Sequence, residues 1–145
     1  MFAHILVPLD GSEFAEQAIE PAQSLAERYG ARITLLTVIM EFPESRLQVA
    51  MRDLQSDARA RQYLEEVRAT QMGTASVPVA LVVTHGLPAE RIAEVVMESQ
   101  ADLIVMSTHG TTGTRYTLGS TAWKILQEAP CPVLLVGAHR PLPKG

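Results

Sequence analysis

The chain has 145 residues, a length that suits one domain with a sizeable buried core. Hydrophobic residues make up 47% and charged residues 19%, a balance that is typical of globular proteins and excludes a largely disordered chain. The formal net charge of −4, with no basic block to offset it, disfavours binding to nucleic acid.

The cysteine count and the length of the apolar runs indicate the compartment in which the protein works. The single cysteine, Cys131, excludes an internal disulfide framework and fits a reducing compartment. The segment Met1–Pro8 has neither the basic region nor the small-residue cleavage site of a signal peptide. Because no apolar run approaches the length that spans a membrane, we expect a cytoplasmic protein that does not associate with membranes.

Short apolar runs alternate with amphipathic segments along the sequence. The expected elements are, in chain order, a strand at 4–9, a helix at 13–29, a strand at 32–39, a helix at 46–70, a strand at 79–84, a helix at 88–100, a strand at 103–106, a helix at 120–128 and a strand at 132–136. Pro21 should kink the first helix. We expect an α/β fold of one domain over residues 1–138, an open five-stranded parallel sheet with helices on both faces, and a flexible tail over 139–145.

Two polar loops follow buried strands and mark the candidate site. One is Asp10-Gly11-Ser12 after the first strand, and the other runs from Ser107 to Ser120 after the fourth strand. In open α/β sheets, ligands bind beyond the carboxyl ends of the strands, so the loops would meet there if the first and fourth strands are neighbours. Glycines let a backbone approach a ligand closely, and the free N–H groups at a helix start can hold an anion.

These loops predict a nucleotide site. Asp10 would accept hydrogen bonds from a ribose hydroxyl, and backbone N–H groups around Gly110, Gly119 and Ser120 would hold phosphates. The Ser120 and Thr121 hydroxyls would add contacts to phosphate or to bound Mg²⁺. The plainer alternative is that each loop is only a turn and a helix cap. The joint placement of the two loops at strand ends favours the nucleotide site.

Other chemistries find less support in the sequence. The four histidines have no metal-ligand spacing. His109, alone among them at the site, is expected to shape its loop by a hydrogen bond, with phosphate contact as the second alternative and acid/base catalysis as a distant third. Cys131 is expected to be a half-buried structural thiol. The sequence contains no Walker A pattern and no lysine in the nucleotide loop, so at most slow ATP hydrolysis is expected.

Four blocks of the sequence together resemble the universal stress protein family. They are Ile5–Ser12, Ala101–Gly110, Leu118–Ala122 and Ala129–Val136. The resemblance implies a Rossmann-like sheet in the strand order 3-2-1-4-5, which makes the first and fourth strands neighbours. It also implies a homodimer built on the last strand, Val133–Val136, and this agrees with the need to cover an apolar sheet edge.

Members of that family that bind ATP carry the loop pattern G-x2-G-x9-G-[ST]. The corresponding positions here are Ser107, Gly110, Gly119 and Ser120, so a serine replaces the first glycine and the spacer has eight residues, one fewer than the pattern. Residue by residue, the resemblance implies that Pro8 and Leu9 wall the adenine, that Asp10 is the ribose-side acid and that the Val38 backbone reads the adenine edge. Ribose and phosphates would be held by Met106, Ser107, Thr108, His109, Gly110, Gly119, Ser120 and Thr121.

The leading hypothesis is therefore a dimeric stress-response protein that binds an adenine nucleotide and acts as a sensor or regulatory module. The expected ligand is ATP, with or without Mg²⁺, and AMP or another adenine nucleotide is the alternative. Two other functions stay open at this point: a nucleotide-free interaction protein of the same family, suggested by Ser107 and the short spacer, and a weak ATPase.

Overall fold

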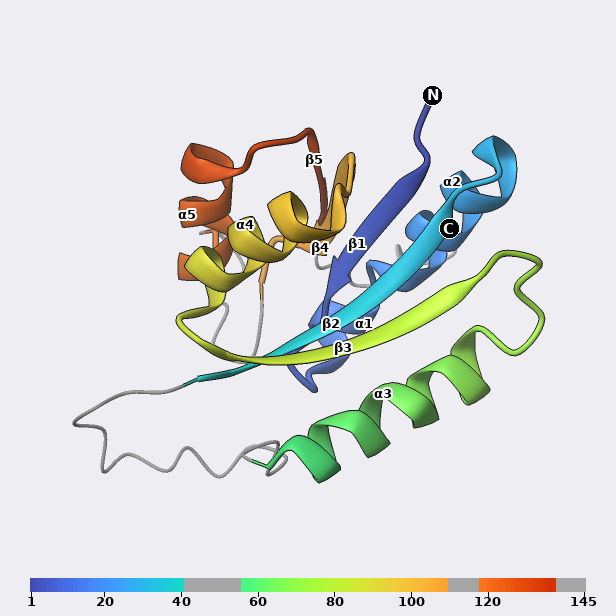
Figure 1. The fold of residues 1–145 in the computed structure, drawn as a ribbon, viewed down its shortest axis with the longest axis horizontal. Coiled ribbons are helices and arrows are strands. Elements are labelled where there is room, and N and C mark those ends of the chain that lie inside the picture. Colours follow the sequence, from blue (N-terminus) through green and yellow to red (C-terminus); the bar gives the residue numbers. More distant parts are fainter. Residues whose placement is uncertain (41–55, 110–117, 138–145) are drawn as a thin grey trace, which may run out of the picture.

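The computed structural model describes residues 1–40, 56–109 and 118–137, and within them the chain forms one five-stranded parallel sheet. The strands are β1 (His4–Pro8), β2 (Arg32–Met40), β3 (Val79–Gly86), β4 (Leu103–Ser107) and β5 (Val133–Val136). They lie in the order β3-β2-β1-β4-β5 (Figure 1). The expected fold class and strand order are confirmed, and β1 lies between β2 and β4 with Ile5 in register with both Ile33 and Leu103.

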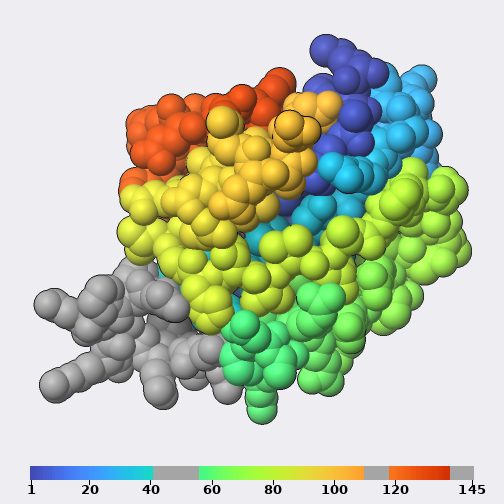
Figure 2. Space-filling model, in the orientation of Figure 1, coloured from blue at the N-terminus to red at the C-terminus, as the bar shows by residue number. Residues whose placement is uncertain are grey.

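Helices cover both faces of this sheet. They are α1 (Glu13–Glu16), α2 (Ile19–Tyr29), α3 (Asp57–Gln71), α4 (Pro88–Ser99) and α5 (Ser120–Glu128). Successive side chains of β1 point to opposite faces, so Ile5 and Val7 join the core beneath α2 and α3, whereas Leu6 joins the core beneath α4 and α5. In the space-filling view of Figure 2, α4 (yellow) lies beside α5 (red).

The first expected helix is divided in two, which corrects the prediction of a single kinked helix at 13–29. α1 ends at Glu16 and α2 begins at Ile19, so the interruption lies upstream of Pro21. The physical reason is that Pro21 has no N–H to donate to the carbonyl four residues earlier, which is that of Gln17, and its ring crowds that carbonyl. The other end of α2 is as expected, because Gly30 closes it at φ 67°.

The second expected helix, at 46–70, begins later than predicted. Ser56 has extended backbone angles (φ −115°, ψ 148°), and its hydroxyl accepts a hydrogen bond of 3.2 Å from the amide of Arg59. Ser56 is therefore a helix N-cap, and no continuous helix runs through it. Residues 46–55 of the predicted helix, Gly110 of the predicted site and the predicted tail at 139–145 all lie outside the described residues.

The remaining expected elements differ only at their ends. β2 and β3 continue to Met40 and Gly86, whereas β1 and β5 are one residue shorter than expected. Of the helices that the structure describes, none has the length and apolar character needed to cross a membrane.

A polar cluster joins three strands at the amino edge of the sheet. The Asp102 carboxylate, just before β4, accepts hydrogen bonds from the backbone amides of Ala3 (2.8 Å) and His4 (3.0 Å). The His4 ring is buried, with Nε2 2.7 Å from the Thr34 hydroxyl and Nδ1 3.2 Å from the carbonyl of Ser99. These contacts suit a neutral imidazole that donates to Ser99 and accepts from Thr34.

We expect this buried histidine to weaken the fold in mild acid. Burial, with a smaller contribution from the neighbouring Arg32 guanidinium, lowers the pKa of His4 below its ordinary value of 6.5. The unfolded chain then binds a proton at a pH at which the folded protein does not, so the free energy of unfolding should fall as pH drops below 6.5.

Urea unfolding of the wild type and of His4→Gln between about pH 7.5 and pH 5 measures this effect. The glutamine variant should lose less stability over that range than the wild type does. An identical acid loss in the wild type and His4→Gln would contradict the assignment.

Candidate functional site

The two predicted loops do meet at one edge of the sheet. β1 and β4 are parallel neighbours, so the residues that follow them, Leu9–Ser12 and Thr108–His109, lie at the same carboxyl edge. The last residues of β4, Met106 and Ser107, are buried, whereas Asp10 is exposed at the edge. The structure therefore places the acidic turn and the start of the glycine-bearing loop on neighbouring strands.

The loop after β1 is fixed to β2 by two hydrogen bonds. The Leu9 amide donates to the carbonyl of Leu36 (2.7 Å), and the buried Thr37 hydroxyl donates to the carbonyl of Leu9 (3.0 Å). Both bonds position the backbone immediately before Asp10. The sequence reasoning missed Thr37, for which the one available signal was a hydroxyl within the apolar run of β2.

Asp10 caps the turn that follows it. Its Oδ1 accepts hydrogen bonds from the Ser12 amide (2.9 Å) and the Ser12 hydroxyl (2.5 Å), and Gly11 adopts the left-handed φ of 87° that this turn requires. The turn thus holds the carboxylate in one place at the edge of the sheet. The capping role foreseen as the plainer alternative is present, and it orients the same side chain that the nucleotide hypothesis needs.

The start of α5 lies against the end of β4. The Thr108 amide donates to the carbonyl of Val136 (2.9 Å), and the Gly119 amide donates to the carbonyl of Thr108 (2.7 Å). Gly119 is the N-cap of α5 and has no side chain with which to cap the first turn. Among the described residues, no side chain caps the amides of Ser120 and Thr121 at this helix start, which is the arrangement that suits an anion.

Hydroxyl groups shape the short segment after β4. The Thr108 hydroxyl lies 2.8 Å from Nδ1 of His109, and the Ser107 hydroxyl accepts a hydrogen bond of 3.3 Å from the His109 amide. Ser107 thus supplies an acceptor that a glycine at this position would lack. Nε2 of His109 is buried and has no hydrogen-bond partner among the described residues.

Val38 lies where an adenine edge could meet the backbone. The register of β1 with β2 ends at the pair Pro8–Leu36, so Val38 extends beyond the end of β1. In a strand, the backbone groups of alternate residues point to the same neighbour. Because the Leu36 carbonyl bonds to the Leu9 amide, the N–H and C=O of Val38 point to the same side, where β1 has already ended.

Two other reactive side chains are not brought to the loops that follow β1 and β4. Cys131 lies before β5 and is half-buried, and burial raises the pKa of its thiol, so it is protonated and weakly nucleophilic at neutral pH. His85 lies on β3, with Nε2 2.5 Å from Asp57. Within residues 1–40, 56–109 and 118–137, no group of three or more His, Cys, Asp or Glu side chains could hold a metal ion.

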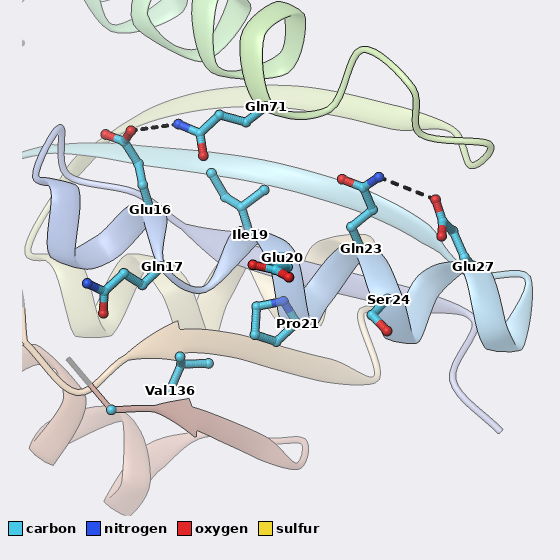
Figure 3. Close-up of a pocket in the computed structure, with 11 residues that line it drawn as sticks. Glu16, Gln17, Ile19, Glu20, Pro21, Gln23, Ser24, Glu27, Gln71 and Val136 are labelled. Atoms are coloured by element: carbon cyan, nitrogen blue, oxygen red, sulfur yellow. Dashed lines mark hydrogen bonds between the residues drawn. The ribbon is translucent and has the colours of Figure 1, made fainter. Parts of the chain in front are cut away.

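A large groove of about 880 Å³ lies elsewhere, along α2 (Figure 3). None of the predicted site residues that the structure describes lines it, so the groove is separate from the candidate site. The loop contacts above, and not the volume of this groove, mark the candidate site at the carboxyl edge of β1 and β4. Residues 110–117 connect His109 to the start of α5 in the sequence, and they lie outside the described part of the chain.

An open parallel sheet with helices on both faces, an acidic turn after β1 and a helix start beside the end of β4 defines a Rossmann-like α/β domain. The chain belongs to the universal stress protein family, whose family model matches residues 1–137.

Individual relatives agree with this assignment. A universal stress protein of Thermus aquaticus, encoded in the QAH/OAS sulfhydrylase 3′ region, is 36% identical over 139 residues, covering 94% of this chain and 99% of the relative. The structure of universal stress protein UspA from Lactobacillus plantarum matches with a TM-score of 0.76 and 28% identity, over 93% of this chain and 97% of that one.

Two structures that share the fold are nucleotide complexes. A universal stress protein in complex with cAMP matches with a TM-score of 0.66 at 21% identity, over 95% of this chain and 98% of that one. The Archaeoglobus fulgidus universal stress protein in complex with dAMP matches with a TM-score of 0.68 at 16% identity, over 93% of this chain and 97% of that one. At these identities the likeness shows the shared fold.

Proposed function

We propose that the protein binds an adenine nucleotide at the carboxyl edge of β1 and β4 and acts as a cytoplasmic regulatory module of the stress response. The observation that carries the proposal is the convergence of the Asp10 turn with the uncapped start of α5, joined to β4 by the 2.7 Å bond between Gly119 and Thr108. The cAMP and dAMP complexes of family members support the adenine class of ligand.

In the proposed site each group has the role that the family resemblance implies for it. Pro8 and Leu9 wall the adenine, the Val38 backbone meets its edge, and Asp10 accepts from a ribose hydroxyl. The remaining contacts to ribose and phosphates come from Met106, Ser107, Thr108, His109, Gly110, Gly119, Ser120 and Thr121.

The uncapped amides of α5 fit a phosphate group, and ATP is the nucleotide we propose. If Mg²⁺ accompanies it, the Ser120 and Thr121 hydroxyls are the groups that would approach the ion. These are the hard oxygen donors that Mg²⁺ prefers.

Replacing Asp10 by alanine should weaken nucleotide binding by at least about 10-fold, because a hydrogen bond to a charged group contributes roughly 1.5–3 kcal/mol. Isothermal calorimetry with ATP, AMP and cAMP, on protein stripped of bound ligand, measures the loss. Asp10→Asn keeps an acceptor for the turn and separates a folding defect from a binding defect. Glu13→Ala, which removes an exposed carboxylate three residues later, is the matched control and should bind as the wild type does.

The proposal fails if the wild type gives neither heat nor a thermal shift with about 1 mM of each nucleotide. That result would favour the alternative of a nucleotide-free interaction protein, for which the hydroxyl contacts of Ser107 would serve only to stabilise the loop. If Asp10→Ala binds the nucleotide as tightly as the wild type does, the protein is still a nucleotide binder, but Asp10 is not one of the residues that contact the ligand.

We also propose a homodimer formed through β5. This strand is the last in the sheet order, and its outer edge pairs with no strand of the described chain. Leu134, in its middle, is 39% exposed. An apolar edge strand is a template for pairing, and a second copy of Val133–Val136 would cover it.

Leu134→Glu should convert the dimer to a monomer, because it places a charge in the middle of the proposed interface. Light scattering coupled to size-exclusion chromatography measures the mass. Leu87→Glu is the control, since Leu87 is similarly exposed, at 41%, but follows β3 at the opposite end of the sheet. A wild-type monomer, or a Leu134→Glu dimer as tight as the wild type, would refute this interface.

A further inference from the structure

The groove along α2 is a surface that the nucleotide site does not use. It begins beside Gly137, just after β5, and extends along α2 as far as Glu27. We call it the α2 groove and define it by Glu16, Glu20, Glu27, Pro21, Val136 and Gly137. Figure 3 shows Val136 on the opposite side of the groove from Pro21, with Gln71 of α3 reaching toward Glu16.

The α2 groove is acidic and partly preorganised. Its lining includes three glutamates, and no lysine or arginine is among the described residues that line it. Glu16 is held by the Tyr63 hydroxyl (2.8 Å) and by the Gln71 amide group (2.7 Å), both from α3. Glu27 accepts a weaker bond of 3.3 Å from Gln23, and Glu20 is exposed. A complementary occupant would carry at least two cations.

The sequence that continues from Gly137 has that character. Residues 138–145 read Ala-His-Arg-Pro-Leu-Pro-Lys-Gly and contain two cations, Arg140 and Lys144, and no acidic side chain. Because Gly137 lines the α2 groove, residues 138–145 follow in sequence directly from a residue of the groove. We propose that the α2 groove is the docking surface for residues 138–145 of the same chain.

The spacing of the charges agrees with this occupant. α2 runs antiparallel to the strands it connects, so a segment that turned back after Gly137 would travel along α2 from Glu20 toward Glu27. Residues around Pro141 and Pro143 favour an extended conformation of about 3.1 Å per residue, which separates Arg140 from Lys144 by about 12 Å. Glu27 follows Glu20 by seven positions in the helix, which places the two residues about 10 Å apart along its axis. The pairs Arg140–Glu20 and Lys144–Glu27 therefore match in spacing and in order.

Nuclear magnetic resonance of the ¹⁵N-labelled full chain tests the proposal. In the wild type, residues 140–144 should show restricted motion by the heteronuclear Overhauser effect. The double variant Glu20→Lys/Glu27→Lys should release them and shift the amide signals of α2. Adding Arg140→Glu and Lys144→Glu to that variant should restore the restricted motion, because the charges are then complementary again. Glu66→Lys/Glu128→Lys, which reverses two exposed charges outside the groove, should leave the segment docked.

Free motion of residues 140–144 in the wild type, or restricted motion that survives the Glu20→Lys/Glu27→Lys change, would overturn the proposal. If the protein is a dimer, samples mixed from labelled and unlabelled chains show whose segment fills the groove. Contacts between labelled and unlabelled chains would mean that the partner's segment fills it, and this too would overturn docking within one chain. None of these readouts depends on nucleotide binding.

Discussion

Replacing Asp102 by alanine should lower the free energy of unfolding by about 2–3 kcal/mol, because it removes charged hydrogen bonds to two backbone amides at once. Asp102 precedes β4, and its carboxylate accepts hydrogen bonds from the amides of Ala3 and His4. Ala3 lies just before β1, and His4 is its first residue. A reciprocal backbone bond, from the Asp102 amide to the His4 carbonyl (3.0 Å), completes this junction. The side chain therefore joins the starts of the two central strands.

The effect of Asp102 should also depend on pH. Burial acts to raise the pKa of its carboxyl, but the hydrogen bonds from the amides of His4 and Ala3 outweigh it and hold the pKa below the ordinary value of 3.8. The stabilisation is therefore complete well above pH 3.8 and is lost as pH falls through the lower pKa of the folded state.

Urea unfolding of the wild type, Asp102→Ala and Asp102→Asn at neutral pH and in acid measures both effects. The asparagine variant keeps one acceptor oxygen and should lose about half as much stability as the alanine variant. A difference between wild type and Asp102→Ala that stays constant down to about pH 2 would show that the carboxylate charge is not responsible.

Thr37→Val should lower the free energy of unfolding by about 1–2 kcal/mol and weaken adenine nucleotide binding by roughly 10-fold. Valine has nearly the shape of threonine, so the change removes the hydroxyl that donates to the Leu9 carbonyl and leaves that carbonyl without this donor. Because Thr37 is 1% exposed, water cannot readily replace the bond. The backbone before Asp10 would then lose one of its two attachments to β2.

Thr34→Val is the matched control for this change. Thr34 lies on the same strand, is also buried, and contacts the His4 ring at the opposite edge of the sheet. Thr34→Val should lower the free energy of unfolding by a comparable amount and leave the affinity for the nucleotide unchanged. Equal losses of affinity in both variants, measured by calorimetry, would mean that the effect of Thr37 is a general weakening of the sheet and not a local one at the Asp10 turn.

Repeating patterns within the sequence were sufficient to predict most of the fold. The buried strands and the inward face of α4, formed by Ile92, Val95 and Val96, follow directly from apolar spacing. The errors lie where a single residue overrides a pattern. Pro21 divides the first helix, and Ser56 caps a helix inside the apolar repeat that predicted a longer one.

The candidate site was predictable only in part. Asp10 and Gly119 follow strands or begin helices, so their positions can be inferred from local sequence. Thr37 could not be inferred, because its hydroxyl bonds to a carbonyl 28 residues away that becomes its neighbour only when the sheet forms. The acceptor role of Ser107 was likewise hidden, since a serine in place of an expected glycine looks like a loss until its bond to the His109 amide is seen.

The bond from the Gly119 amide to the Thr108 carbonyl also bears on the shortened spacer between Gly110 and Gly119. It ties together the two ends of the segment between these residues, so the positions of the helix start and the strand end are set at that bond. Shortening the spacer from nine residues to eight changes the entropy of closing such a loop by only about 0.1 kcal/mol. A change of one residue in the length of the spacer therefore costs little in closure entropy, and the amide of Gly119 keeps the position that this bond sets at the start of α5.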